Sequence, residues 1–578
     1  MIIMSNYSYL KKLLLIFDKN LITIFPLIIL FLISTLIELL SIALIGPYIS
    51  FLLEPSNKIF LQNFLDVNLD IYTFNQIIIF LSGLLLLIFI VKFFLALLVR
   101  FAIKRFSLKR RQELQIRLLK SYQSMSYASF ITRGSSDFIK NVRELSGDCI
   151  STLDASLRIL SETIVFIAIV SYLFWIQPMV VLSLLSIIIL IILIHNYTLK
   201  PKTIIYGKNR TEALSYIYQA VDEGLKGFKE VKILGKENYF RQTQKIGLDK
   251  IYINELKSEL ILFYPRYLYE LVIVIFIISY VTIKLNYGMQ SIEIIPLIGT
   301  FSIASLRIIP SISIISSCLI GIQYSYFAID IIYKDIISLI NNKKNSVKSV
   351  TGLLNNQFKS IELRDVKFKY PNTDDYIFDG LNLKIKGCGC VGIIGENGSG
   401  KSTLVDILLG FLKVNSGKIF FNNKETKNLS DFTSSTGYLP QDHLIISDKV
   451  KKNISLEIDE NQINLKKLNK VIDSVNLEKM ISKLPSNIET LIGNDGIRLS
   501  GGEYKKIALA RLFYHNKDFL ILDEATNSLD KKSEEIIINE LNKIKKDKTI
   551  IIISHNKNAL SACDVIYEIK NKRIELKK

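Results

Sequence analysis

The chain has 578 residues, of which 49% are hydrophobic and 22% charged, with a mean hydropathy of +0.32 and a net charge of +19. This length excludes a single small domain, and high hydropathy combined with many charges excludes a uniformly soluble protein. The five cysteines are irregularly spaced, so no disulfide framework is predicted. Such values are typical of a chain with one apolar part and one polar part.

Six apolar stretches are long enough to cross a bilayer, which needs about 20 mostly apolar residues. They lie at about 21–53, 75–103, 149–176, 178–199, 260–285 and 294–324. Several are longer than a bilayer requires, so we expect their helices to continue beyond the membrane.

Lysine and arginine are concentrated in segments 104–148 and 200–258, whereas segment 54–74 contains only Lys58. Because basic loops stay on the cytosolic side, both termini and both long loops are predicted to be cytosolic.

Apolar residues three or four apart predict that the two basic segments are helical. Short turns are expected near 128–145 and 220–238, where Gly134 and Gly227 interrupt the pattern. In the outer segment, four apolar residues at 60–65 share a helical face, which predicts either a surface helix or ordinary loop packing.

A polar stretch at 341–357 predicts a linker between a membrane domain, residues 1–340, and a second domain, residues 358–578. From Ser360 onward, short β runs alternate with helical patterns. The predicted fold class is therefore a six-helix membrane bundle followed by an α/β domain with its own core.

The segment GENGSGKST matches the phosphate-binding P-loop, and it lies between a predicted strand and a predicted helix, as the motif requires. Its glycines let successive N–H groups face an anion, and the helix N-terminus adds its dipole. Lys401 is expected to reach the terminal phosphates and the Ser402 hydroxyl to ligate Mg²⁺. The predicted nucleotide contacts are Gly395, Glu396, Asn397, Gly398, Ser399, Gly400, Lys401, Ser402 and Thr403.

The segment FLILDE at 519–524 predicts a buried strand that ends in two acids. Asp523 is predicted to hold the Mg²⁺ shell, and Glu524 to polarise an attacking water. Two acids after a strand are common, so their weight comes from their pairing with the P-loop.

A third motif, LSGGE at 499–503, opens a basic helix. Along the chain the P-loop comes first, LSGGE second and FLILDE third. Motifs in this order and at these distances resemble the nucleotide-binding domain of ABC proteins over about 358–578. The resemblance implies ATP hydrolysis with Mg²⁺. By motif position it implies these further contacts: Tyr370 on adenine, Gln441 at Mg²⁺ and the water, Ser500, Gly501, Gly502 and Glu503 in the signature, Asp530 in the D-loop, and His555 at the γ-phosphate. Gln is commoner than Glu at 503, and we infer no loss of activity from this difference.

Six spans ahead of this domain resemble the exporter class of ABC proteins. In that family the LSGG segment of one domain closes on the P-loop of another, so the resemblance implies a dimer. A homodimer is the simplest interpretation, and a heterodimer with a degenerate partner stays open. The turns of the two inner loops would pass the closing motion to the spans.

The membrane half also resembles a narrower group, the bacterial lipid-linked oligosaccharide flippases. The similar stretches are IELLSIALIGPYIS at 37–50, YPRYLYE at 264–270 and LRIIPS at 306–311. This resemblance implies outward movement of a polyprenyl-pyrophosphate-linked glycan across the bacterial inner membrane.

Ionisable residues inside membrane spans are costly and are functional candidates. Asp154, Arg158 and Glu162 alternate in sign at helical spacing and can neutralise one another, as can Arg266 and Glu270. Lys92 and Arg307 have no acidic partner within a helical turn and are interpreted as spare cations. By their match to the flippases, Lys92, Arg266 and Arg307 are candidate pyrophosphate contacts.

Three alternatives use the same ATP-binding domain differently. An exporter of a peptide or an amphipathic drug would have a mainly apolar or acidic cavity. A soluble ABC ATPase that acts on nucleic acid is opposed by the six spans, so the expected partners are membrane lipid and substrate and not nucleic acid. An ATP-gated channel has little support.

Overall fold

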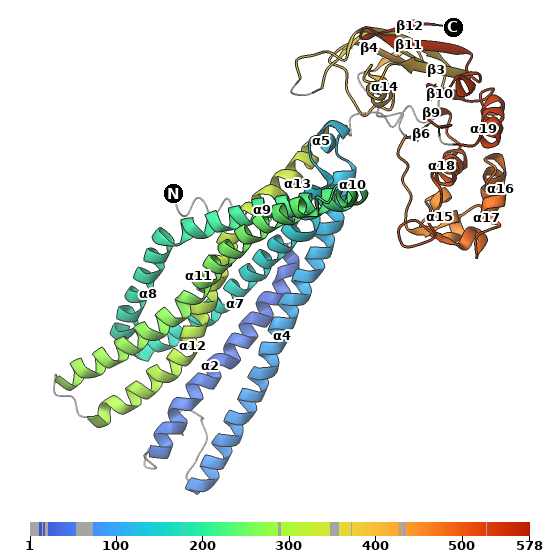
Figure 1. Cartoon of the computed structure of the whole chain (residues 1–578). Coiled ribbons are helices and arrows are strands. Elements are labelled where there is room, and N and C mark those ends of the chain that lie inside the picture. Colours follow the sequence, from blue (N-terminus) through green and yellow to red (C-terminus); the bar gives the residue numbers. More distant parts are fainter. Residues whose placement is uncertain are drawn as a thin grey trace. The chain divides into compact units, whose positions relative to one another are not determined.

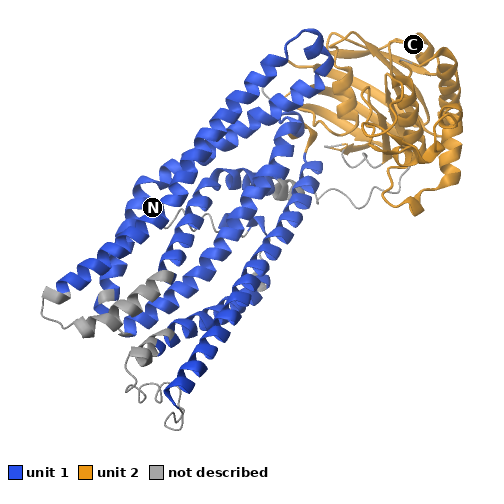
Figure 2. Cartoon of the chain, turned by 60° about the horizontal axis from the view of Figure 1, so that its bottom comes forward, with its two compact units in different colours: residues 1–125, 130–344 blue, residues 126–129, 345–578 orange. Residues whose placement is uncertain are grey.

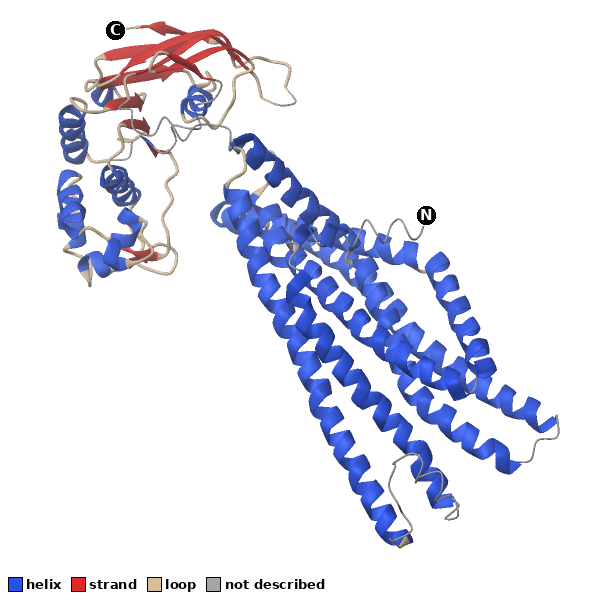
Figure 3. Cartoon of the chain, turned by 180° about the vertical axis from the view of Figure 1, so that it is seen from behind, coloured by secondary structure: helices blue, strands red, loops and turns tan. Residues whose placement is uncertain are grey.

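The computed structural model describes residues 11–13, 15–17, 21–53, 73–176, 178–286, 291–346, 358–370, 373–426, 429, 435–527 and 529–577. The chain divides into a helical unit, residues 1–125 and 130–344, and an α/β unit, residues 126–129 and 345–578 (Figure 2). In the described part of the chain, strands occur only in the α/β unit (Figure 3).

Long helices build the helical unit (Figure 1). They are α2 (Phe25–Leu53), α4 (Phe74–Gln123), α7 (Ser146–Ile176), α8 (Pro178–Thr198), α9 (Lys200–Lys226), α11 (Glu237–Asn286), α12 (Ser291–Tyr324) and α13 (Tyr326–Ser346). Six segments among the described residues are long and apolar enough to span a membrane: Phe25–Leu44, Phe74–Gln123, Ser135–Trp175, Val181–Thr198, Glu237–Ile283 and Arg307–Tyr324. The predicted six spans are thereby confirmed as apolar helices.

The helices α4 and α11 each have 50 residues. At a rise of 1.5 Å per residue each is about 75 Å long, against a hydrocarbon core of about 30 Å. The excess confirms that these helices continue beyond the membrane.

Short helices form the two turns expected in the inner loops. The first turn contains α5 (Tyr127–Ile131), α6 (Ser135–Lys140) and a π-helix (Asn141–Leu145), and the second contains α10 (Phe228–Ile233). Gly134 is the N-cap of α6, and Gly227 separates α9 from α10. The two glycines therefore interrupt the helices where the sequence pattern predicted a break.

A buried carboxylate, Asp335 of α13, connects the first turn to the rest of the helical unit. Its side chain is 3% exposed and accepts hydrogen bonds from Tyr122 Oη at 2.7 Å, Arg133 Nη1 at 2.8 Å and Asn141 Nδ2 at 3.1 Å. These donors come from α4, from the residues between α5 and α6, and from the π-helix. One acid thus holds three neighbouring segments that lie about 200 residues before it in the sequence.

Two sheets form the core of the α/β unit. The six-stranded sheet has the order β12 (Arg573–Leu576), β11 (Val565–Lys570), β3 (Gly389–Gly395), β10 (Thr549–Ile553), β9 (Phe519–Asp523), β6 (Thr436–Leu439). The four-stranded sheet has the order β2 (Phe378–Lys386), β1 (Ser360–Phe368), β4 (Ser416–Phe421), β5 (Lys424–Thr426). A third, two-stranded sheet pairs β7 (Asp448–Lys449) with β8 (Leu491–Ile492).

Helices complete this unit. They are α14 (Lys401–Leu408), α15 (Val450–Ser455), α16 (Leu465–Ser474), α17 (Glu478–Ile481), α18 (Gly501–His515), α19 (Lys531–Ile544) and α20 (Lys557–Leu560). Successive residues of β10 point to opposite faces of the sheet, as strand geometry requires. Ile551 and Ile553 pack with α14 and the four-stranded sheet, whereas Ile550 and Ile552 pack with α18 and α19. A fully apolar strand is therefore covered on both faces, which is typical of a parallel strand.

Two predictions fall partly or wholly outside the described residues. The outer segment with Phe60, Leu61, Phe64 and Leu65, predicted as a surface helix or as ordinary loop packing, lies outside the described residues, as do residues 347–357 of the predicted linker. Residues 341–346 of the predicted linker are helical, because α13 continues as far as Ser346.

We predict that Asp335→Ala lowers the free energy of unfolding by about 2–4 kcal/mol, because it leaves two buried polar groups, Tyr122 and Asn141, without their acceptor and removes the partner of the partly exposed Arg133. Thermal unfolding of the purified protein in detergent measures this loss. The control is Asp222→Ala, which removes the surface ion pair with Lys226 (2.7 Å) and should change stability by less than about 1 kcal/mol. Equal melting temperatures for the two variants would contradict the role given to Asp335.

Candidate nucleotide site and intramembrane charges

Four parallel strands bring the predicted nucleotide residues to one edge of the six-stranded sheet. The pairs Ile553 with Ile393, Ile553 with Asp523, and Leu522 with Leu439 set the register of β3, β10, β9 and β6. The carboxyl ends of these strands lead into the P-loop, His555, Glu524 and Gln441. Ligands of open α/β sheets bind outside the carboxyl ends of the strands.

The P-loop joins β3 to the N-terminus of α14. Gly398 and Gly400 have φ values of +82° and +102°, which glycine adopts readily. A Cβ on Gly400 would also lie 2.9 Å from side-chain atoms of Ile377 and Phe378. The loop conformation therefore requires glycine at this position for two independent reasons.

The Lys401 ammonium lies over the P-loop and donates to the carbonyl oxygens of Gly395 at 2.7 Å and Glu396 at 2.9 Å. Burial lowers the pKa of Lys401, and the nearby carboxylates Glu524 and Asp523 oppose that shift. Burial raises the pKa of Asp523, and the charge of Glu524 raises it further. A cation thus faces two acids across the phosphate cradle.

Glu524 has φ +52°, in the left-handed region that non-glycine residues rarely adopt. Its N–H donates to the Ile553 carbonyl at 2.9 Å, and its own carbonyl accepts from Lys505 Nζ at 2.7 Å. The carboxylate oxygen Oε2 accepts from Gln441 Nε2 at 3.0 Å and Asn527 Nδ2 at 3.1 Å. Strained backbone held from several sides is frequent at catalytic positions.

Lys505 and Asn527 are supporting residues that the motif analysis missed. Lys505 is buried in α18, and its ammonium also donates to the Asn527 carbonyl at 2.8 Å. The available signal was a lysine in the apolar part of the helix after LSGGE, on the same face as Ala508 and Leu509, which are three and four residues further on.

Tyr370, the predicted adenine contact, is joined to the P-loop by a hydrogen bond between its hydroxyl and Thr403 Oγ1 at 3.1 Å. Its ring packs edge-on against Phe368, with 5.1 Å between the centroids. The structure thus places this aromatic ring beside the phosphate cradle.

The signature LSGGE forms the N-terminus of α18 through a capping box. Ser500 N–H donates to Glu503 Oε2 at 2.8 Å, and Glu503 N–H donates to Ser500 Oγ at 3.3 Å. This pattern is S-x-x-E, so glutamate at 503 has a structural role of its own. Gly501 and Gly502 are the first two residues of the helix.

Asp530 lies at the start of α19, and His555 lies just after the end of β10. Asp530 is the N-cap of α19 and accepts from Ser533 N–H at 3.1 Å. Hydrogen bonding to the Ser533 side chain, and then to its backbone, lowers the pKa of the Asp530 carboxyl. His555 is exposed just after β10. Ser528, two residues before Asp530, lies outside the described residues.

The predicted Mg²⁺ ligands are a hydroxyl (Ser402), an amide oxygen (Gln441) and a carboxylate (Asp523). These are hard oxygen donors of the kind that Mg²⁺ prefers. The charge of Glu524 adds to burial in raising the pKa of Asp523, as expected for two acids that follow one another at the end of β9. The donor set therefore fits a magnesium nucleotide.

The α/β unit also includes residues 126–129 of the first inner turn. The Tyr127 ring packs on Phe411, with 5.2 Å between the centroids. Tyr127 and Ala128 border the core cluster that contains α14. The turn predicted to transmit motion thus supplies four residues to the unit that carries the P-loop.

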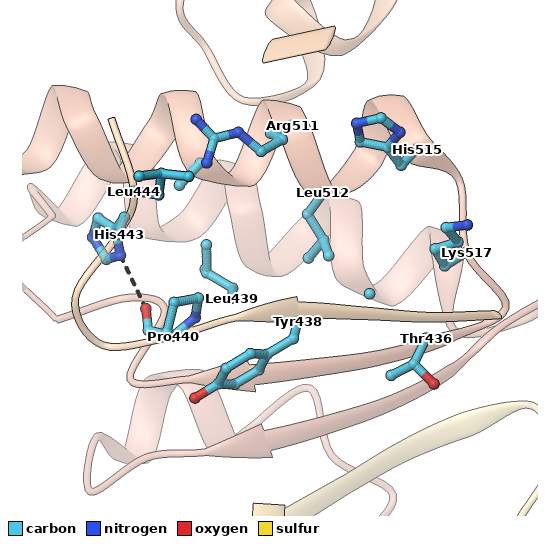
Figure 4. A pocket seen from close by; sticks show the side chains of 12 residues that line it. Thr436, Tyr438, Leu439, Pro440, His443, Leu444, Arg511, Leu512, His515 and Lys517 are labelled. Carbon is cyan, nitrogen blue, oxygen red and sulfur yellow. Dashed lines mark hydrogen bonds between the residues drawn. The ribbon is translucent and has the colours of Figure 1, made fainter. Parts of the chain in front are cut away.

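A pocket of about 320 Å³ lies between β6 and α18 (Figure 4). Leu439 points from β6 toward α18, whereas Tyr438 points to the other face. His443 Nδ1 lies 2.9 Å from the Pro440 carbonyl oxygen in its wall. The pocket is lined by none of the P-loop residues, and Gln441, which directly follows Pro440, is not among its lining residues.

Lys92 and Arg307 in the membrane helices are not spare cations, and that interpretation was wrong. Glu38 of α2 pairs with Lys92 Nζ at 2.9 Å and with Arg307 Nε at 2.7 Å. Arg307 Nη2 also lies 3.4 Å from Glu162. The partners come from other helices, so spacing within one helix could not reveal them.

The remaining charges follow the prediction in part. Arg158 pairs with Asp154 at 3.2 Å and Arg266 with Glu270 at 3.1 Å, as expected. Glu162 does not complete the set on its own helix, because it accepts from Ser311 at 2.9 Å and pairs with Arg307.

Comparisons with known proteins agree with this architecture. The family described as the ABC transporter transmembrane region matches residues 24–293, and the ABC transporter family matches residues 378–527. The solved structure of a bacterial Atm1-family ABC exporter with ATP bound has a TM-score of 0.77 and 18% identity, covering 96% of this chain and 94% of that one. At this identity the likeness shows the fold.

Curated relatives match over a shorter region. A putative export ATP-binding/permease protein of Rickettsia typhi is 35% identical over 243 residues, covering 42% of this chain and 41% of that protein. A putative multidrug export ATP-binding/permease protein of Staphylococcus aureus is 34% identical over 223 residues, covering 37% of each. The matched region thus spans about two fifths of the length of these relatives.

We predict that Glu503→Gln leaves stability unchanged within a few tenths of a kcal/mol, because Gln can also accept from the Ser500 N–H. Glu503→Ala removes one half of the capping box and should lower stability by about 1 kcal/mol. Thermal unfolding distinguishes the variants, and equal melting temperatures for Ala and Gln would show that the cap is unimportant.

Asp406 in α14 gives a prediction for pH. Burial, with a smaller contribution from Asp523, raises the pKa of Asp406 to about 6. Because the folded pKa lies above the unfolded value, ionisation of Asp406 opposes folding above about pH 6, and this penalty disappears below about pH 4. Asp406→Asn should therefore raise stability at pH 8 by on the order of 1 kcal/mol, since water screens this partly exposed group, and should have little effect near pH 4. A gain that is the same at both pH values would contradict this account.

Proposed function

Because the chain belongs to the ABC exporters that fuse a transmembrane region to a nucleotide-binding domain, we propose that it is an ATP-driven half-transporter that moves a lipid-linked oligosaccharide across the bacterial inner membrane. The observation that carries the ATPase part is the convergence of the P-loop, Glu524, Gln441 and His555 at one sheet edge. The domain boundaries 1–340, 341–357 and 358–578 stay predictions.

Each residue has a distinct role in the proposed reaction. The P-loop N–H groups and Lys401 bind the phosphates, and Tyr370 stacks on adenine. Glu524 orients and polarises the attacking water, with Gln441 and Asn527 holding its carboxylate. His555 contacts the γ-phosphate. Mg²⁺, held by Ser402, Gln441 and Asp523, would neutralise charge on the phosphates.

We further propose that two copies of the chain assemble. Family resemblance implies that Ser500, Gly501, Gly502 and Glu503 of one copy and Asp530 near them close on the P-loop of the other. Two observations support this proposal. Ser500 and Gly501 are exposed at the start of α18, and the hydrogen bonds described for Ser500 and Glu503 are made with each other, so this end of the helix is accessible to a second copy. ATP binding would favour the closed pair, and hydrolysis would release it.

The substrate proposal rests on the basic residues within the membrane helices and on the three short flippase-like stretches. Arg307 and Lys92 lie on different helices but share Glu38, so they can face one anionic group. Arg266, already paired with Glu270, is a weaker candidate.

Export of a peptide or an amphipathic drug is the second candidate. Two observations favour it: the pairing of all three cations with acids, and the name of the multidrug export relative. In either case the basic inner loops support the proposal that the termini and the nucleotide-binding domain are cytosolic.

We predict that the purified protein in lipid hydrolyses ATP, that a polyprenyl-pyrophosphate glycan raises the rate, and that Glu524→Gln lowers it at least 100-fold because the water is no longer polarised. Phosphate release measures the rate. Robust ATP hydrolysis at a rate that does not depend on the glycan lipid would be consistent with a transporter but would favour export of a drug or a peptide. Full activity in the variant would remove Glu524 from the mechanism.

A further inference from the structure

The intramembrane acid Glu38 is surrounded by cations that are easier to reach than the acid itself. The Glu38 side chain is 6% exposed, whereas Lys92 and Arg307 are 30% and 25% exposed. An incoming anion would therefore meet the two cations before it meets Glu38.

The Arg307 guanidinium faces Glu38 with two nitrogens. Its Nε lies 2.7 Å from Oε1, and its Nη2 donates to Oε2 at 3.0 Å. Only the Nη2 contact is a hydrogen bond, and the same guanidinium donors bind phosphate as well as carboxylate. Glu38 thus occupies the side of Arg307 that a phosphate group would use.

Two of these contacts are short but poorly directed. Within the described part of the chain, Glu38 Oε1 and Arg307 Nε have ionic neighbours but make no hydrogen bond of good geometry. An anion whose oxygens are better aligned with the donors can therefore replace the carboxylate, because charge-assisted hydrogen bonds depend on alignment.

Glu162 is placed differently. It touches Arg307 at 3.4 Å and is itself held by the Ser311 hydroxyl at 2.9 Å. It can keep the guanidinium in position while Glu38 moves away. The four charges Glu38, Glu162, Lys92 and Arg307 sum to zero, and release of Glu38 leaves the other three with a net charge of +1.

We propose that Glu38 is a specificity-determining residue, an internal counter-anion that neutralises Lys92 and Arg307 until a phosphate-bearing headgroup displaces it. This inference rests on the proposed function and names its substrate class, lipids with a phosphate or pyrophosphate group. A neutral amphiphile cannot displace Glu38, so the exchange selects against it.

The test is binding to the full-length protein in nanodiscs, with polyprenyl pyrophosphate, neutral polyprenol and inorganic pyrophosphate as separate probes. Glu38→Gln should bind polyprenyl pyrophosphate about tenfold more tightly than wild type, the scale of one charge-assisted hydrogen bond, with no change for polyprenol. Glu38→Asp, which keeps the charge on a shorter side chain, should fall between the two and serves if Glu38→Gln does not fold.

Matched controls separate competition for Arg307 from general charge. Glu162→Gln removes the same charge but should gain less or lose affinity, because Glu162 positions Arg307. In an Arg307→Gln background, Glu38→Gln should gain little. Equal gains for Glu38→Gln and Glu162→Gln, or tight wild-type binding that Glu38→Gln fails to improve, would overturn the proposal.

The probes also separate this inference from the proposed function. If Glu38→Gln binds only inorganic pyrophosphate more tightly than wild type does, the result would support Glu38 as counter-anion and contradict a lipid-linked substrate. A gain for both pyrophosphate probes supports both statements. Absence of binding by every variant would overturn both.

Discussion

A charge inside hydrocarbon is tolerated only beside a partner, and this constraint organises the centre of the helical unit. Glu38 of α2 reaches Lys92 of α4 and Arg307 of α12, and Arg307 reaches Glu162 of α7. Four helices are thereby tied at one point by charges that sum to zero. A binding site for an anionic substrate built on these cations must compete with the protein's own acids, which connects stability and selectivity at the same residues.

In the α/β unit, too, a small number of contacts positions the residues of the proposed site. Parallel pairing of β3, β10, β9 and β6 delivers the P-loop, His555, Glu524 and Gln441 to one edge, and Lys505 and Asn527 then hold the Glu524 segment. In the helical unit, Asp335 similarly holds the first inner turn, four residues of which belong to the α/β unit. The Glu524 segment and the first inner turn, both expected to move, are thus held by side chains such as the buried Lys505 and Asp335.

The local features of this architecture could be predicted from the sequence. Hydropathy located the six apolar spans found among the described residues, and the breaks at Gly134 and Gly227 located the turns. Pairings between distant segments could not be predicted, because helical spacing reports only neighbours on one helix. Spacing therefore suggested that Lys92 and Arg307 were unpaired and that Glu162 would pair with Arg158. Lys505 was missed for the same reason, since its acceptors lie 19 and 22 residues away.

The most direct test of the central claim is movement of a fluorescent polyprenyl-pyrophosphate glycan across sealed proteoliposomes. The account predicts that ATP on the side of the nucleotide-binding domain moves the labelled lipid to the opposite leaflet, where an added quencher detects the change in accessible fluorescence. ATP hydrolysis without movement of this lipid, together with uptake of an amphipathic dye, would contradict the proposed substrate and assign the chain to drug export.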